Sequence, residues 1–150
     1  MIRFTSEQPL DGGLLERAFT LDGVPGLLWT SATAPGTAPA TTPPILLGHP
    51  GGLDGMRPRL LERARQCVAS GFAAATLELP GAGDRPRLPG VDLARADLRR
   101  ALEAGEAVGG DVVDRLVLPL VELAVPEWRG LVDGLLALPG VGGPVGYSGG

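Results

Sequence analysis

Two short apolar runs with an amphipathic stretch between them form the clearest pattern along the chain. Residues 45–48 are wholly apolar and residues 72–79 are nearly so, which is typical of strands buried on both faces of a parallel sheet. Residues 56–70 repeat with a helical period, and Gly71 is a natural helix end. The apolar stripe of this helix consists of Leu60, Leu61, Ala64, Cys67 and Val68, and its polar side of Arg59, Glu62, Arg63, Arg65 and Gln66. This strand–helix–strand order predicts two parallel strands joined by a right-handed crossover.

The preceding part of the chain predicts an antiparallel hairpin. Residues 17–21 have the pattern of a strand, residues 22–26 (Asp-Gly-Val-Pro-Gly) that of a turn, and residues 27–31 that of the return strand. Residues 32–44 contain only Ala, Thr, Pro and Gly. They predict a surface loop or a flexible link.

Helices are predicted after the second apolar run. Asp92 is a candidate cap for a charged helix that runs to about Val108, and Asp111 is a candidate cap for a second helix. The second helix has a broad apolar face, and Pro119 is expected to kink or break it. Residues 84–124 are long for a simple crossover, so they form either a helical cap over the sheet edge or helices packed on the sheet.

A further helix is predicted from Pro126, because proline suits the first turn of a helix. Its buried face consists of Trp128, Leu131, Val132, Leu135 and Leu136. Pro139-Gly140 is expected to end this helix, and a short strand then leads to Ser148.

Composition narrows the function. The 150 residues suit one domain, and a net charge of −4 gives no reason to expect nucleic acid or an anionic membrane as partner. No apolar run has the length of a transmembrane helix and the first residues lack a signal-peptide core, so we expect a cytoplasmic protein. Cys67 is the only cysteine and His49 the only histidine, which excludes an internal disulfide and an ordinary multi-histidine metal site. We therefore expect no metal and no cofactor.

Residues 146–150 carry the candidate chemistry. Gly146-Tyr147-Ser148-Gly149-Gly150 has the form Gly-x-Ser-x-Gly of a nucleophile elbow, a strained strand-to-helix turn that exposes a serine above a sheet. A glycine-rich tail without function has the same composition, so the motif gains weight only from its place after the predicted strands.

Taken in order, these features resemble the N-terminal half of an α/β-hydrolase. They are the N-terminal hairpin, a buried strand ending in His49-Pro50-Gly51-Gly52, an amphipathic helix, a second buried strand ending in Pro80-Gly81-Ala82-Gly83, and the serine motif. The resemblance implies an α/β fold with a mostly parallel sheet, an antiparallel hairpin and three αβα layers. Residues 1–150 would be the N-terminal part of one such domain, with a possible helical cap at 84–124.

The resemblance implies the roles of five residues in acyl transfer. Ser148 would be the nucleophile, and Gly149 would donate one N–H group to the oxyanion. The loop after the first buried strand would supply the other donor. Pro50 has no N–H group, so Gly51 is the first candidate and Gly52 the second. His49 precedes this loop and would organise it, since the catalytic base of the family follows the serine.

The acid and the base of the family's triad both follow the serine in the chain, where this sequence has only Gly149 and Gly150. We therefore expect the chain to be part of a longer protein, and the 150 residues alone to be a poor catalyst and prone to associate. The expected substrate is a small ester or other acyl compound.

Other candidate residues have plainer explanations. Asp54, Glu78 and Asp84 are expected to be loop charges or helix caps, Cys67 a core residue and Trp128 a packing residue.

Two other classes of function are alternatives to a serine hydrolase. A nucleotide-binding Rossmann-type domain requires Gly-x-Gly-x-x-Gly, and both Gly81-x-Gly83 and Gly140-x-Gly142 lack the third glycine. A non-catalytic interaction protein with the hydrolase fold is the remaining alternative, because fold alone does not decide function.

Overall fold

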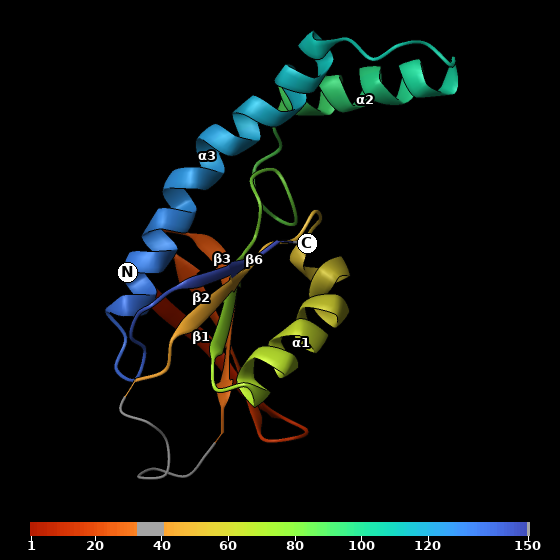
Figure 1. Ribbon diagram of the computed structural model, residues 1–150. Coiled ribbons are helices and arrows are strands. Elements are labelled where there is room, and N and C mark those ends of the chain that lie inside the picture. Colours follow the sequence, from red (N-terminus) through yellow and green to blue (C-terminus); the bar gives the residue numbers. More distant parts are fainter. Residues whose placement is uncertain (33–40, 150) are drawn as a thin grey trace. The chain divides into compact units, whose positions relative to one another are not determined.

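A computed structural model describes residues 1–32 and 41–149. These residues form three helices and six strands (Figure 1). The predicted loop at 32–44 falls largely on residues 33–40, outside the described residues. The chain divides into two compact units, the first made of residues 1–78 and 128–150 and the second of residues 79–127.

The first unit is built on a mixed sheet with the strand order β1-β2-β3-β5-β4-β6. The strands are β1 (Ile2–Leu10), β2 (Leu14–Leu21), β3 (Val24–Ser31), β4 (Pro44–Leu47), β5 (Ala73–Leu77) and β6 (Gly146–Ser148). The pairs β1–β2, β2–β3 and β3–β5 are antiparallel, whereas β4 pairs in parallel with both β5 and β6. The α/β class is thus as predicted, but the sheet of the described residues is not mostly parallel. The first strand, β1, was not predicted, and it extends the antiparallel part.

The predicted hairpin is confirmed with a shorter turn. Asp22 (φ 49°) and Gly23 (φ 82°) both have positive φ, as a two-residue type I′ turn between antiparallel strands requires. The return strand therefore begins at Val24, and Pro25 pairs with Thr20 inside it. Strand β1 has an almost continuously exposed, polar sequence at the sheet edge, which hid it from the hydrophobic pattern.

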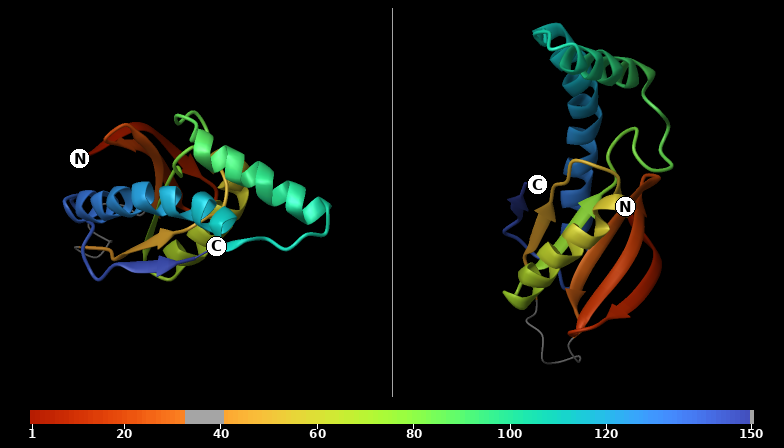
Figure 2. Two further views of the ribbon diagram at one scale, coloured as in Figure 1. Left: turned by 90° about the horizontal axis from the view of Figure 1, so that it is seen from above. Right: turned by 90° about the vertical axis from the view of Figure 1, so that its right-hand side faces the viewer.

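Helices cover both faces of the sheet in the first unit (Figures 1 and 2). Helix α1 (Leu53–Ala69) packs on one face, and the end of helix α3 (Gly110–Leu136), from Trp128 onwards, packs on the other. The cluster on the α1 side consists of Leu14, Trp29, Leu47, Leu53, Leu60, Ala64 and Ala74. The cluster on the α3 side includes Phe19, Leu21, Leu28, Leu46, Leu77, Leu131 and Leu135.

Helix α1 begins three residues earlier than predicted, with Gly52 as its N-cap. The buried carboxylate of Glu78, just after β5, accepts the N–H group of Leu53 with both oxygens, at 3.1 and 3.3 Å. A carboxylate at this end of a helix satisfies an amide and interacts favourably with the helix dipole. Gly71 (φ 93°) follows the helix end, as predicted.

The second unit contains α2 (Pro89–Glu103) and residues 110–127 of α3. Asp92 and Asp111 lie in the first turns of these helices instead of capping them, since α2 starts at Pro89 and α3 at Gly110. Helix α2 ends at Glu103, before the predicted Val108, because Gly105 (φ 68°) turns the chain away. The predicted helical cap at 84–124 falls within this unit, and its role as a cap stays a prediction.

Helix α3 is continuous, so a break at Pro119 and a helix start at Pro126 are both wrong, whereas a kink at Pro119 stays a prediction. A proline inside a helix frees the carbonyl group four residues earlier. Here these carbonyls belong to Arg115 and Glu122, which are exposed. Water can satisfy carbonyls at exposed positions, which lowers the cost of both prolines.

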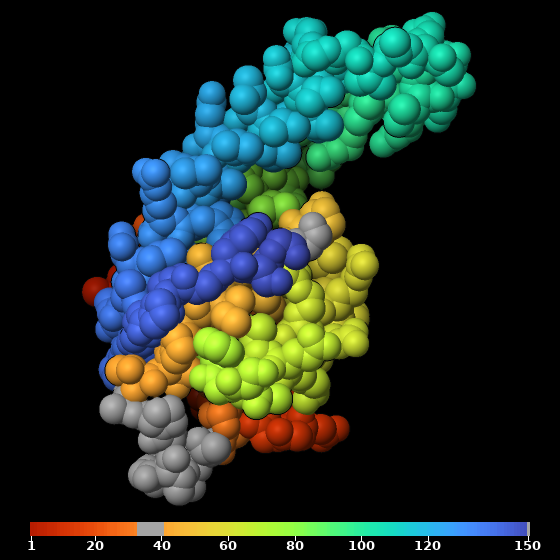
Figure 3. All heavy atoms as spheres, viewed as in Figure 1, coloured from red at the N-terminus to blue at the C-terminus, as the bar shows by residue number. Residues whose placement is uncertain are grey.

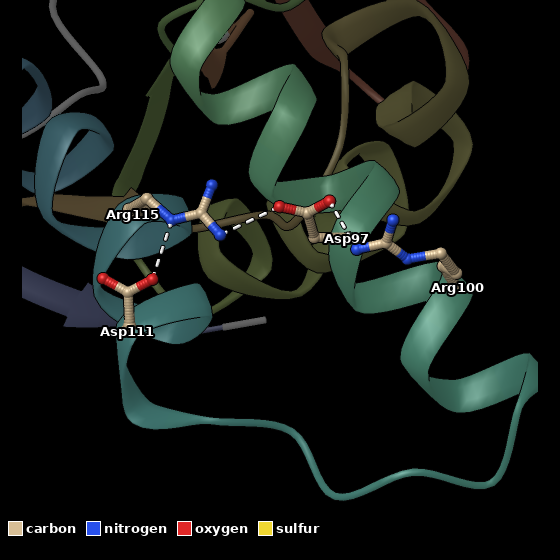
Figure 4. A network of polar contacts seen from close by, with 4 residues as sticks. All are labelled: Asp97, Arg100, Asp111 and Arg115. Atoms are coloured by element: carbon tan, nitrogen blue, oxygen red, sulfur yellow. Dashed lines mark hydrogen bonds and ion pairs between the residues drawn. The ribbon is translucent and has the colours of Figure 1, made fainter.

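An arginine network links the two helices of the second unit (Figure 4). Arg115 contacts Asp97 of α2 at 2.9 Å and Asp111 of its own helix at 3.2 Å, and Arg100 contacts Asp97 at 3.1 Å. The hydrogen bond from Arg115 holds the pKa of Asp97 below its usual value, and the same bond raises the pKa of Arg115. Strong screening by water limits what such exposed pairs contribute to stability.

Candidate active site

The sheet topology brings the predicted site segments to one edge. From β4 the chain crosses to β5 on one side, and it later returns to β6 on the other side of β4. The strand order therefore reverses between β4 and β6, and a crevice at the carboxyl ends of such strands is the usual ligand site of open α/β sheets. The 49–52 loop follows β4, and Ser148 ends β6. In the space-filling view the end of β6 (blue) lies beside the start of α1 (yellow) (Figure 3).

Ser148 is the last residue of β6 and is half-buried. It pairs with Leu47 of β4, and its carbonyl oxygen accepts the N–H group of Gly48 at 2.9 Å. Successive side chains of a strand point to opposite faces. Tyr147 stacks edge-on against Trp128 of α3, and the hydroxyl of Ser148 lies on the α1 side.

The backbone of Ser148 differs from the predicted elbow. Asp22 is the only non-glycine residue among residues 1–32 and 41–149 that has a positive φ, so Ser148 continues the strand without the strain of a nucleophile elbow. The closing glycine of the motif, Gly150, lies outside the described residues.

Arg63 of α1 contacts the ends of both strands. Its Nη1 donates to the carbonyl oxygen of Gly48 at 2.8 Å. Its Nη2 lies 2.6 Å from the carbonyl oxygen of Ser148, 2.9 Å from Ser148 Oγ and 3.1 Å from the carbonyl oxygen of Gly149. A planar, permanently charged guanidinium suits several acceptors at once. Arg63 thus joins α1 to β4 and β6 and touches the candidate nucleophile.

Arg63 was not among the predicted site residues, because it lies on the polar side of the predicted helix, where charged residues usually face water. Its place on the helix that directly follows the 49–52 loop could have indicated a position near the site.

His49 is buried, and among the described residues it makes no hydrogen bond with Ser148. Its Nε2 lies 2.8 Å from the carbonyl oxygen of Leu77 at the end of β5. A carbonyl only accepts hydrogen bonds, so Nε2 is the donor of this contact. Among the described residues, Nδ1 has no hydrogen-bond partner. The contact joins the 49–52 loop to β5, which fits an organiser of the loop.

The predicted oxyanion donors lie on two neighbouring segments. Gly51 and Gly52 precede the first residue of α1, and Gly149 follows β6. Within residues 1–32 and 41–149, no protein acceptor is hydrogen-bonded to the amides of Gly51 and Gly149. A side chain at Gly51 would come within 3.3 Å of Met56, so the loop packs closely on α1 at this point.

A cleft of about 190 Å³ is bordered by Gly149, the residue after Ser148, and by Arg63, which contacts Ser148. It is lined by Pro50, Met56, Arg59, Leu60, Arg63 and Gly149. These residues come from the 49–52 loop, from one face of α1 and from the end of β6. The cleft therefore borders both segments that carry the predicted oxyanion donors.

The remaining candidates have structural explanations. Glu78 is a helix cap, and Asp54 is exposed in the first turn of α1. Asp84 is an exposed residue of the second unit. Burial raises the pKa of the Cys67 thiol against the opposing effect of Arg63, which makes the thiolate scarce.

The described residues contain neither a candidate metal site nor a candidate membrane span. No group of three or more His, Cys, Asp or Glu side chains among them is placed to hold a metal ion. None of their helices combines the length and apolar character needed to cross a membrane.

The fold is similar to that of two solved esterases. A cold-adapted esterase from an Arctic intertidal metagenomic library is 24% identical with a TM-score of 0.60, over 98% of this chain and 55% of that one. Acetyl xylan esterase 1 from Thermoanaerobacterium sp. JW/SL YS485 is 15% identical with a TM-score of 0.52, over 99% of this chain and 44% of that one. The chain thus spans about half the length of these enzymes. No protein-family model and no curated protein matches it. At these identities the likeness establishes a hydrolase-like fold.

Proposed function

We propose that this chain is the nucleophile-bearing part of a serine hydrolase of the α/β-hydrolase superfamily that cleaves carboxylic esters, with Ser148 as nucleophile. The observation that carries the proposal is the position of Ser148. It ends β6 at the reversal of strand order, beside the glycine loop that follows β4, in a sheet similar to those of esterases.

The proposed chemistry is acyl transfer in two steps. Ser148 Oγ attacks the ester carbonyl while a base takes its proton, and the resulting tetrahedral intermediate expels the alcohol, which receives that proton. Water then cleaves the acyl-serine by the same route and releases the acid. The amides of Gly149 and Gly51 are the proposed donors to the oxyanion, with Gly52 as the alternative to Gly51.

The base is proposed to come from outside the described residues. His49 is the only histidine of the chain, and its Nε2 is bound to the carbonyl oxygen of Leu77. Arg63 has a supporting role, because a hydrogen bond donated by a cation to Ser148 Oγ favours the alkoxide over the hydroxyl. In family order the acid and the base follow the nucleophile.

A small acyl group fits the proposed site best. The cleft of about 190 Å³ is smaller than the roughly 300–1,000 Å³ of pockets that enclose drug-sized ligands. Its walls contain the apolar residues Pro50, Met56 and Leu60, which suit a short hydrocarbon chain.

The test is the hydrolysis of p-nitrophenyl acetate by the natural protein and its Ser148→Ala variant. We expect the variant to lose at least about 10³-fold in kcat/KM, because removal of a nucleophile abolishes the acyl-enzyme route. The matched control is Ser70→Ala, an exposed serine at the end of α1, which should keep the wild-type rate.

Full activity of the Ser148→Ala variant would refute the proposal. The non-catalytic alternative predicts that a protein partner, if one is found, binds the Ser148→Ala variant as well as the wild type.

A serine-directed fluorophosphonate gives an independent result, because peptide mass analysis should find its adduct on Ser148 and nowhere else in the chain.

A further inference from the structure

The cleft bordered by Gly149 and Arg63 has an unbalanced positive charge. Two of its six lining residues are the arginines Arg59 and Arg63, and none is acidic. The two arginines are four residues apart on α1, so they lie on the same face of the helix one turn apart. Two cations in this position repel each other, and no carboxylate of the cleft wall offsets the repulsion.

The two guanidinium groups are used differently. Arg63 is committed to the carbonyl oxygens of Gly48, Ser148 and Gly149. The side chain of Arg59 is exposed. Within residues 1–32 and 41–149, its guanidinium group has no hydrogen bond or ion pair to another side chain or to a carbonyl oxygen. Its planar set of N–H donors matches the two oxygens of a carboxylate.

We propose that the cleft binds a carboxylate and that Arg59 is its main ligand. The inference rests on the proposed function and extends it to the substrate class. The preferred substrates are then esters whose acyl chain ends in a second, free carboxylate, with the chain against Pro50, Met56 and Leu60 and the carboxylate on Arg59.

Direct binding tests the cleft without any catalysis. Glutarate, titrated calorimetrically into the Ser148→Ala variant, should bind, and the further change Arg59→Gln should weaken its binding at least about tenfold, since a charged hydrogen-bond pair is lost. The matched control is Arg129→Gln, which removes the same charge from an exposed helical position of the first unit outside the cleft. This control should leave the affinity unchanged.

The catalytic test compares monomethyl glutarate with dimethyl glutarate, two esters with the same acyl chain. Arg59→Gln should raise KM for monomethyl glutarate at least about tenfold more than it raises KM for dimethyl glutarate, because only the first ester has a free carboxylate.

The outcomes separate this inference from the proposed function. If Ser148→Ala keeps full activity while glutarate binding depends on Arg59, the nucleophile is wrong and the carboxylate site stands. If glutarate does not bind, or Arg59→Gln and Arg129→Gln weaken it equally, the carboxylate site is wrong. Binding of inorganic phosphate but not of glutarate would also overturn it.

Discussion

The two compact units differ in what their apolar side chains touch. In the first unit, apolar residues of the sheet, α1 and the end of α3 form two clusters, one on each face of the sheet. In the second unit the buried apolar side chains of the helices are Val91 and Ala94. Its large apolar side chains that are exposed to solvent are Leu93, Leu102, Val113, Val117, Leu118, Val121, Leu123 and Val125.

Helix α3 contains this difference within a single element. Its residues 110–127 belong to the second unit and its residues from 128 onwards to the first. Leu131 is fully buried, whereas Leu118 is 52% exposed. An apolar side chain stabilises a fold only if another surface removes it from water. Leucine residues at the two ends of this helix should therefore contribute very differently to the free energy of unfolding.

The largest expected change in stability is for a leucine at the buried end of α3, and a leucine at its exposed end is the control. Leu131→Ala should cost about 2–5 kcal/mol of unfolding free energy, because it leaves a cavity in a packed cluster. Leu118→Ala should change the unfolding free energy by no more than about 0.5 kcal/mol. Urea unfolding followed by far-ultraviolet circular dichroism measures this difference, because both units contain helix. Equal losses in the two variants would show that Leu118 is packed as tightly as Leu131.

A smaller effect is expected from the cap of α1. Glu78→Ala should cost about 1–3 kcal/mol, since the N–H group of Leu53 loses its acceptor in a buried place. Glu62→Ala is the matched control, because Glu62 is an exposed carboxylate on the same helix, and its change should be within about 0.5 kcal/mol. Chemical unfolding of both variants gives the comparison. A Glu78→Ala variant as stable as the wild type would rule out a stabilising cap.

The smallest effect concerns the arginine network of the second unit. Arg115→Gln should raise the pKa of Asp97 towards its ordinary value, because the hydrogen bond from Arg115 is the main cause of the lowered value. A lowered folded-state pKa contributes stability above the ordinary pKa, and this contribution is lost as the pH falls through the lowered value. Carboxyl-detected NMR titration of Asp97 measures the shift directly.

Arg99→Gln is the control for this titration. Arg99 is exposed on the same helix as Asp97, and its replacement should leave the titration of Asp97 close to that of the wild type. An unchanged pKa of Asp97 after Arg115→Gln would show that the network does not persist in solution.

Local chemistry determined several elements from the sequence alone. Asp22-Gly23 encodes the tight turn of the hairpin, because few residues tolerate positive φ and a hairpin turn needs it at both positions. Gly71 ends α1 for a related reason, and the apolar runs of β4 and β5 indicated strands with both faces covered. The order of these elements also predicted that a short strand, after the crossover between the two apolar runs, leads to Ser148.

Only the tertiary structure decided which groups the polar residues Arg63 and Glu78 bind. Arg63 and Glu78 lie far apart in the sequence from the groups they bind, and a pattern along one helix or strand contains no record of such partners. Helix α3 also continues through Pro119 and Pro126, which local rules place at a kink or at a helix end. The sequence thus specifies conformations that depend on neighbouring residues, whereas burial, charge pairing and the face of Ser148 depend on segments that meet only in the folded sheet.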